Sequence, residues 1–367
     1  MIYLVAGARP NFMKIAPIVW DFQSRAFHDF RIVHTGQHYD YEMSQTFFMD
    51  LDLKRPDHFL ESGSGSHAEQ TARVLTAFEK ICLDERPDLV VVVGDINSTL
   101  AASLAAAKLH IPVAHIESGL RSFDKAMPEE INRLLTDHIS DHLFASEQSG
   151  IDNLRHEGIP EERVHFVGNI MIDSLVRILP RAKKPHPAAG EYILATIHRP
   201  SNVDDPASFR QVIELLTHAA QHHPVIMPVH PRTKKSILAF GLEKHFSHTS
   251  HVPDSPEQGT IYLIPPTGYV DFVGLMAGAR CVITDSGGIQ EETTFLMIPC
   301  ITMRESTERP ATVEIGTNTI VGIDREAFTE AVERIRAGTY KKGNRPPLWD
   351  GETGKRICDV LLSTYKT

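Results

Sequence analysis

The chain has 367 residues, of which 42% are hydrophobic, and this length favours two domains over one. The formal net charge of -10 argues against a general nucleic-acid binder, because such a protein presents a basic face. No apolar run reaches the roughly 18 residues of a membrane-spanning helix, and the apolar start lacks the basic leader of a signal peptide, so we expect no membrane association.

In the first half of the chain, short β-branched runs alternate with helical patterns. The expected strands cover residues 2–6, 30–34, 89–93, 112–116, 142–145 and 164–167. Continuous apolar strands separated by helices are typical of parallel sheets that are covered on both faces. With right-handed crossovers, this pattern predicts a doubly wound α/β domain.

A break in the pattern follows at LPRAKKPHPAAG (179–190), which contains three prolines and a basic cluster, and we predict a linker there. The alternation then resumes, with expected strands over residues 192–197, 225–229, 261–264, 280–284, 299–303 and 319–322. The sequence therefore predicts two Rossmann-like domains around a cleft, 1–178 and 191–345. Residues 346–367 should form a last helix that packs back toward the first domain.

The spacing of the cysteines and histidines does not predict a metal site. The chain contains four widely separated cysteines: Cys82, Cys281, Cys300 and Cys358. They form no C-x-x-C pair, so we expect buried, reduced thiols in a cytoplasmic protein. His245, His248 and His251 stand three apart, but no cysteine or carboxylate joins them at ligand spacing, and a solvated loop is the favoured interpretation.

One glycine-rich stretch matches a cofactor motif. GSGSHA (63–68) fits G-x-G-x-x-A and precedes a helical pattern. It lies well past the first expected strand and among serines, so a loop is favoured over a dinucleotide site. The sequence also contains no P-loop, no G-x-S-x-G elbow and no H-E-x-x-H motif.

Polar residues follow several of the expected strands. Asp95 and Glu117 come after the third and fourth strands, Glu129 opens a helix after Pro128, and His198 begins the loop after the first strand of the second half. Ligands of open α/β sheets bind beyond the carboxyl ends of strands. Each acid alone could be a strand end, a loop acid or a favourable charge in a first helical turn, but three together favour a site.

The stretch TDSGGIQEETTF (284–295) begins a helix with two glycines, each of which costs about 1 kcal/mol relative to alanine. Asp285 or Ser286 is expected to cap this helix. Gly287 and Gly288 then leave main-chain N–H groups bare, which suits a phosphate at a helix N-terminus.

Glu291 and Glu292 follow in the same stretch but do not complete a capping box. They point about 100° apart on a helix, so one is expected to accept hydrogen bonds from ribose hydroxyls while the other stays in solvent. The stretch therefore predicts a nucleotide site with phosphate and ribose near one helix start.

The motifs GARPNFMKIAP, GDINST, HIESGLRS, PEEINR, HR-x-x-N, GYVDF, TDSGGIQEE and TERP occur in this order along nearly the whole chain. In this order and spacing they resemble the non-hydrolysing UDP-N-acetylglucosamine 2-epimerases. The resemblance implies a glycosyltransferase-B-like fold, a UDP-sugar substrate, a cytoplasmic homodimer, and no metal or nicotinamide cofactor.

The resemblance also implies a role for each matching position. Asp95, Glu117 and Glu129 are expected to be the catalytic carboxylates, with His198 near the departing diphosphate. The expected substrate-binding residues are Arg9 and Lys14 in the first motif, Ser286, Gly287 and Gly288 at the phosphate, Glu292 at the ribose, Phe272 at the uracil, and His230 and Arg309 completing the nucleotide pocket.

Inversion at C2 of the sugar requires removal of a proton that no neighbouring carbonyl acidifies. Loss of UDP from C1 builds positive charge on the ring, and the family is understood to eliminate UDP to give 2-acetamidoglucal and to re-add it. Cationic groups suit the diphosphate, and carboxylates suit the proton steps. The alternatives are a hydrolysing 2-epimerase that releases N-acetylmannosamine and UDP, a 2-epimerase of another UDP-2-acetamido sugar, a glycosyltransferase on the same fold, and a non-catalytic UDP-sugar sensor.

The sequence departs from the resemblance in two places. Many bacterial members have HRREN, whereas this chain has Pro200 and Ser201 within HRPSN. Members activated by a second substrate molecule carry Gln-His-x-x-Gln, whereas this chain has Gln37 and His38 with Asp40 and no second glutamine in that stretch. We therefore expect weak or absent activation by substrate, and a sigmoidal dependence of rate on UDP-N-acetylglucosamine concentration would contradict this.

Overall fold

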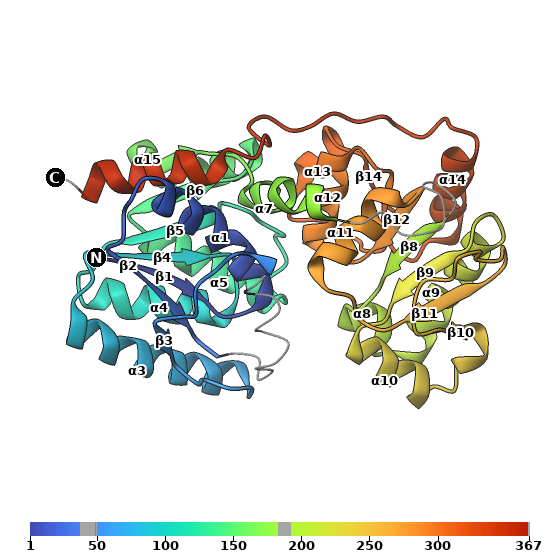
Figure 1. Cartoon of the computed structure of the whole chain (residues 1–367), viewed down its shortest axis with the longest axis horizontal. Coiled ribbons are helices and arrows are strands. Elements are labelled where there is room, and N and C mark those ends of the chain that lie inside the picture. Colours follow the sequence, from blue (N-terminus) through green and yellow to red (C-terminus); the bar gives the residue numbers. More distant parts are fainter. Residues whose placement is uncertain (37–47, 49, 183–191, 366–367) are drawn as a thin grey trace. The chain divides into compact units, whose positions relative to one another are not determined.

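A computed structural model describes residues 1–36, 48, 50–182 and 192–365 of the chain. The chain divides into two compact units, one formed by Met1–Val176 with Pro347–Thr367 and the other by Arg177–Pro346. Each unit is built on a seven-stranded parallel sheet with helices packed against it (Figure 1). The doubly wound, Rossmann-like α/β architecture expected from the sequence is confirmed in both.

In the first unit the strand order is β3-β2-β1-β4-β5-β6-β7. The strands are β1 (Ile2–Ala6), β2 (Phe30–His34), β3 (His58–Phe59), β4 (Leu89–Val93), β5 (Val113–Ser118), β6 (His142–Ala145) and β7 (Val164–Phe166). The order reverses between β1 and β4, so their carboxyl ends flank the position where open α/β sheets bind ligands.

The helices of the first unit form layers against the sheet. They are α1 (Arg9–Ser24), α3 (His67–Glu85), α4 (Asn97–Lys108), α5 (Pro128–Ile139), α6 (Gln148–His156), η1 (Glu161–Arg163), α7 (Ile170–Ile178, which runs into the second unit) and α15 (Thr353–Tyr365). In one layer α3, α4 and α5 are neighbours, and α1 packs against α15 (Figure 1).

The GSGSHA stretch is explained by the start of α3. Ser66 is the N-cap of this helix, where its side chain accepts from the Glu69 main-chain nitrogen while the Glu69 side chain bonds back to Ser66. This S-x-x-E capping box satisfies two N–H groups at the helix start. The loop expected over 63–68 therefore ends at Ser66, since His67 and Ala68 belong to the helix.

The C-terminal helix α15 is tied to α1 inside the first unit. Cys358 is buried, with its sulfur 3.8 Å from the Ile18 carbonyl oxygen, and Asp359 pairs with Arg25 at 2.6 Å. An ideal Cβ on Gly354 would lie 2.8 Å from the Cβ of Pro17, so the missing side chain lets the two helices approach closely.

In the second unit the strand order is β10-β11-β9-β8-β12-β13-β14. The strands are β8 (Ile193–Thr196), β9 (Val225–Pro228), β10 (Ser247–His248), β11 (Ile261–Ile264), β12 (Cys281–Thr284), β13 (Cys300–Thr302) and β14 (Asn318–Ile320). The reversal lies between β8 and β12, whose carboxyl ends lead into His198 and the glycine-started helix.

The helices of the second unit are η2 (Leu179–Arg181), α8 (Pro200–Val203), α9 (Pro206–Ala220), α10 (Pro231–Ala239), η3 (Glu243–His245), α11 (Tyr269–Gly278), α12 (Gly287–Leu296), α13 (Pro310–Glu314) and α14 (Arg325–Arg336). The core of this unit joins side chains of its central strands to α9 and α14, for example Ile283, Phe209 and Phe328. These apolar faces explain why the helices pack where they do, because their burial drives the packing.

Some sequence expectations change in detail. The loop expected around His245–His251 is wrong at two positions, because His245 ends η3, and His248 belongs to β10 and pairs with Leu263 of β11. Most of the linker expected over 179–190 lies outside the described residues. All four cysteines are free and buried, as expected. Within the described residues, no three His, Cys, Asp or Glu side chains are grouped for a metal ion, and every helix is too short or too polar to cross a membrane.

Candidate active site

One asparagine holds the turn after β1. The Asn11 side-chain oxygen accepts hydrogen bonds from the Gly7 and Ala8 main-chain nitrogens at 3.3 and 2.9 Å. Its side-chain nitrogen donates to the Val93 carbonyl oxygen at 3.2 Å, which ties the carboxyl ends of β1 and β4 together. Lys14 lies three residues further along α1, on the same face of the helix. The first motif therefore supplies both the turn and a cation beside it.

Lys14 and Glu117 form a buried ion pair. The Lys14 Nζ contacts the Glu117 Oε2, and each residue is only 8% exposed. An ideal Cβ on Gly94 would lie 3.1 Å from the Lys14 Nζ and 3.5 Å from the Glu117 Oε2, so the glycine lets the end of β4 approach the pair. Each charge depends on the other, because removal of one partner leaves a buried charge uncompensated.

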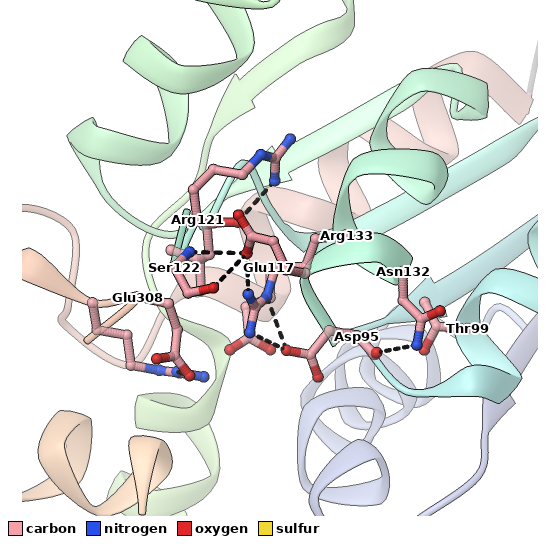
Figure 2. A network of polar contacts seen from close by, with 12 residues as sticks. Asp95, Thr99, Glu117, Arg121, Ser122, Asn132, Arg133 and Glu308 are labelled. Carbon is pink, nitrogen blue, oxygen red and sulfur yellow. Dashed lines mark hydrogen bonds and ion pairs between the residues drawn. The ribbon is translucent and has the colours of Figure 1, made fainter. Parts of the chain in front are cut away.

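Asp95 follows Gly94 and is held by α5. Arg133 contacts the Asp95 Oδ2 through Nε at 3.0 Å and through Nη2 at 2.8 Å. The neighbouring Asn132 donates to the Asp95 main-chain oxygen at 2.9 Å, and Figure 2 shows both side chains directed at Asp95. Arg133 also pairs with Glu130 at 2.5 Å. Asp95 is therefore the more exposed end of a carboxylate–guanidinium–carboxylate chain.

Glu129 and Glu130 are adjacent in PEEINR but have different environments. Glu130 is buried and accepts hydrogen bonds at 2.9 Å from the Ser122 nitrogen and hydroxyl and from the Phe123 nitrogen. Burial alone would raise its pKa, but these bonds and the Arg133 charge hold the pKa of Glu130 below its usual value. Glu129 is half-buried, and its side chain makes no hydrogen bond or ion pair within the described part of the chain. Glu129 is thus the acid of this pair that is open to a ligand.

In the second unit, His198 is anchored by Asp285. The buried Asp285 carboxylate accepts from the His198 and Arg199 main-chain nitrogens at 2.9 and 2.8 Å, and it pairs with the His198 Nδ1 at 3.0 Å. Burial alone would raise its pKa, but His198 and the main-chain donors hold the pKa of Asp285 below its usual value. Of the two residues expected to cap α12, Asp285 instead binds the loop after β8, and Ser286 takes the N-cap position. The His230 ring lies 5.3 Å from the His198 ring.

The start of α12 leaves main-chain N–H groups without a side-chain cap. Ser286 occupies the N-cap position, but its side chain makes no capping bond within the described residues. An ideal Cβ on Gly287 would lie 2.5 Å from the Arg309 Nη1, whereas one on Gly288 would have no atom of the described chain within 4 Å. Gly287 therefore makes room for Arg309, and Gly288 leaves the open approach that an anion needs.

Arg309 lies beside α12 in a buried charge cluster. Its Nε contacts the Glu291 Oε1 and its Nη1 the Glu308 Oε1, both at 2.7 Å, and Arg304 pairs with the other Glu308 oxygen at 2.9 Å. Two guanidinium groups thus balance two carboxylates. The expectation that either Glu291 or Glu292 stays in solvent is wrong, since they are 1% and 3% exposed.

Glu292 is held by a tyrosine that the sequence analysis did not single out. Tyr269, the first residue of α11, donates its hydroxyl to the Glu292 Oε1 at 2.5 Å. Burial raises the pKa of Glu292 to about 7, against the lowering effect of the Tyr269 bond, and the Glu291 charge adds to the rise. Phe272 is half-buried in the same helix. Arg9 is the first residue of α1, and its side chain lies outside the described part of the structure.

Each unit therefore brings part of the expected set together. In the first unit, Lys14 and Glu117 meet beside Gly94, and Asp95 follows Gly94 directly. In the second unit, His198 and His230 form one group, while Gly287 and Arg309 form another. Sequence reasoning missed the residues that hold these groups in place: Asn11, Glu130, Arg133, Asp285 as an anchor, and Tyr269. The i,i+3 spacing of Glu130 and Arg133 is one signal that could have revealed a pair.

We predict different costs for two alanine substitutions in adjacent glycines. Gly287→Ala should lower the melting temperature by several degrees, because the new methyl group displaces the Arg309 guanidinium from two buried carboxylates, at about 1–3 kcal/mol for each charged hydrogen bond that is lost. Gly288→Ala should leave the melting temperature unchanged or slightly raised, since its methyl group enters open space. Thermal unfolding followed by circular dichroism measures both, and equal destabilisation would contradict this account.

Comparison with known proteins agrees with the fold and with the motifs. The family model described as UDP-N-acetylglucosamine 2-epimerase matches residues 21–362. A UDP-N-acetylglucosamine 2-epimerase of Methanococcus maripaludis is 39% identical over 100% of this chain and 99% of its own length. A UDP-2,3-diacetamido-2,3-dideoxy-D-glucuronate 2-epimerase of Pseudomonas aeruginosa is also 39% identical, over 98% of this chain and 99% of its own.

Solved structures give the same result. The Methanocaldococcus jannaschii UDP-GlcNAc 2-epimerase, in complex with UDP-GlcNAc and UDP, has a TM-score of 0.88 and 40% identity, and the match covers 99% of each chain. A glycotransferase of kitacinnamycin has a TM-score of 0.56 at 12% identity, which shows a shared fold alone and fits the glycosyltransferase-B-like architecture. On its sequence and its structure together, this chain belongs to the UDP-N-acetylglucosamine 2-epimerase family.

Proposed function

We propose that this chain interconverts UDP-N-acetylglucosamine and UDP-N-acetylmannosamine by eliminating UDP to 2-acetamidoglucal and re-adding it on the opposite configuration at C2. Family membership supports the substrate class. The observation that carries the proposal is the grouping of a buried Lys14–Glu117 pair and the Arg133-bound Asp95 at the carboxyl ends of the neighbouring strands β4 and β5. A mere binding module would not require such a set of acids.

The acids of the first unit are assigned to the proton steps. Removal of the C2 hydrogen requires a base, and its return from the other face requires an acid, so at least two carboxyl groups must face the sugar. Glu117 and Asp95 are each positioned by a cation, and Glu129 is the half-buried third candidate. Fixed geometry matters here, because a displacement of about 1 Å is sufficient to slow catalysis strongly.

The second unit is assigned to UDP. The N–H groups at the start of α12, reached past Gly288, suit a phosphate, and His198 beyond β8 suits the departing diphosphate. Glu292 is assigned to the ribose and Phe272 to the uracil. Arg309 is assigned a supporting role instead of a direct phosphate contact, because its guanidinium bonds two buried carboxylates.

Incubation with UDP-N-acetylglucosamine in D2O tests the proposed reaction. We expect deuterium at C2 of a nucleotide-linked manno product, because the hydrogen that returns comes from an acid that exchanges with solvent. Free N-acetylmannosamine would indicate the hydrolysing reaction. Absence of exchange without an acceptor would contradict the proposal and favour a transferase or a sensor. Asp95→Asn and Glu117→Gln should each abolish exchange while UDP still binds, and exchange that survives either change would remove that acid from the mechanism.

A second substrate is favoured by one comparison. The relative named for UDP-2,3-diacetamido-2,3-dideoxy-D-glucuronate is as similar in sequence as the relative named for UDP-N-acetylglucosamine. Both sugars carry a 2-acetamido group, so the same elimination applies to each. Comparison of kcat/KM for the two substrates decides between them, because this ratio measures discrimination.

The same proposal includes the homodimeric state and the cytoplasmic location that the family resemblance implies. Sedimentation equilibrium at micromolar concentration tests the first, and a monomer mass would remove it from the proposal. Fractionation of the source cells tests the second.

We predict that nucleotide binding weakens as the pH falls from 8 to 6. The ribose hydroxyls donate to Glu292, so the ligand binds the ionised carboxylate better, and the pKa of about 7 in the free protein means that this form is lost across the range. The dissociation constant of UDP-glucose, whose diphosphate diester does not titrate here, should rise about tenfold. In Glu292→Gln this pH-dependent component should vanish. An identical pH profile in the variant would exclude Glu292 from the ribose site.

A further inference from the structure

Glu117 lies at an irregular point of β5. Its φ angle is +69°, in the left-handed region that residues other than glycine rarely adopt. The register of β5 against β6 also shifts between Ile116 and Ser118, which marks a bulge at Glu117. Bulges re-aim side chains, and non-glycine residues in this region persist only where their surroundings hold them. Some neighbouring group must therefore hold the Glu117 backbone.

Asp137 of α5 contacts both sides of this bulge. Its Oδ1 lies 2.6 Å from the Nδ1 of His115, two residues before Glu117. Its Oδ2 accepts from the main-chain nitrogen of Gly119, two residues after Glu117, at 3.0 Å. Asp137 and His115 are fully buried, each with 0% exposure. One carboxylate thus spans the bulge that carries Glu117.

The His115 ring extends this contact to Asp95. Its Nε2 lies 2.8 Å from the carbonyl oxygen of Gly94, the residue before Asp95. A carboxylate and a carbonyl oxygen only accept hydrogen bonds, so the ring makes both bonds only when both of its nitrogens carry hydrogen. The ring is then an imidazolium between the loop after β4 and the bulge of β5.

The surrounding charges complete the cluster. The Arg121 Nη2 contacts the Asp137 Oδ2 and the Glu157 Oε2, each at 2.7 Å, and Arg121 Nε also bonds Glu157. With a charged His115, two cations face two carboxylates, so the buried group is balanced. Burial alone would raise the pKa of Asp137, but His115 and Arg121 hold that pKa below its usual value.

We propose that the Asp137–His115 pair is a positioning device for the reaction, which holds Glu117 in its left-handed conformation and fixes the Gly94–Asp95 turn beside it. Neither residue touches the sugar in this proposal. It rests on the assignment of Glu117 and Asp95 to the proton steps, and it adds two residues that act through them. The pair sets the rate of the proton steps and leaves UDP binding, which belongs to the other unit, unaffected.

Two variants and one control test the pair. Asp137→Asn places an N–H₂ group against the N–H donors of His115 or Gly119. His115→Gln cannot bond Asp137 and the Gly94 carbonyl oxygen at the same time. We expect kcat to fall about 10- to 100-fold in each, with KM and the dissociation constant of UDP unchanged, because loss of the restraint releases Glu117 from a strained backbone. Asp141→Asn is the control, since Asp141 accepts from the Val113 nitrogen at 2.9 Å at the opposite end of β5, and its kcat should stay unchanged.

The readouts separate positioning from general structure. Should Asp137→Asn fail to fold, His115→Gln carries the test. A folded His115→Gln with normal kcat, or with a raised KM and normal kcat, would overturn the proposal, as would an equal loss of kcat in Asp141→Asn.

Two further measurements need no turnover. A nitrogen–proton NMR spectrum at neutral pH, with the His115 signals assigned by their absence in His115→Gln, should show hydrogen on both ring nitrogens. One bare nitrogen would overturn the proposal. A crystal structure of His115→Gln should show Glu117 with a negative φ, and a retained left-handed φ would contradict the restraint. These outcomes hold even if the wild-type protein exchanges no C2 hydrogen, a result that would count against the proposed function alone.

Discussion

The buried ion pair between Lys14 and Glu117 is the interaction on which the first unit's site depends. Neither charge has much access to water, so each is stable only in the presence of the other. This requirement fixes the surrounding chain. The turn after β1 must place α1 so that Lys14 reaches Glu117, the strand β4 must be followed by a glycine, and β5 must bulge so that Glu117 points at the lysine.

The buried charges of the second unit are compensated in a different way. There the acids Glu291 and Glu308 are paired with arginines, and Asp285 is bonded by main-chain donors, by Asn202 and by the His198 ring, so these buried side chains hold neighbouring groups in place. What remains available is the half-exposed His198 and the uncapped start of α12. Glycine at position 287 is needed for packing, and glycine at 288 for access, so one pair of residues serves two separate physical needs.

Much of this arrangement follows from the sequence. The apolar runs identified the main strands of both sheets, because strands buried on both faces leave a continuous hydrophobic signal. The short edge strands β3 and β10, of two residues each, leave no such signal. Motif positions located Lys14 in the first half of α1, and Asp95, Glu117 and His198 at or just after strand ends. The partners of these residues, such as Arg133 and Asp285, could not be located in the same way. Their pairings depend on the distances between packed elements, and the periodicity of the sequence carries no information on those distances.

The errors at Asp285 and Glu291 have one cause. At the level of sequence, an acid near a helix start is equally compatible with a cap, a solvated charge or a ligand contact. Burial decides between these, and burial is a property of the whole fold. The same reasoning explains why the sequence does not mark His115 and Asp137. A histidine inside a strand and an aspartate inside a helix are ordinary in a sequence. Only the structure shows that both lie around the Glu117 bulge. In this chain, the residues proposed for the chemistry are therefore easier to find in the sequence than the residues proposed to hold them in place.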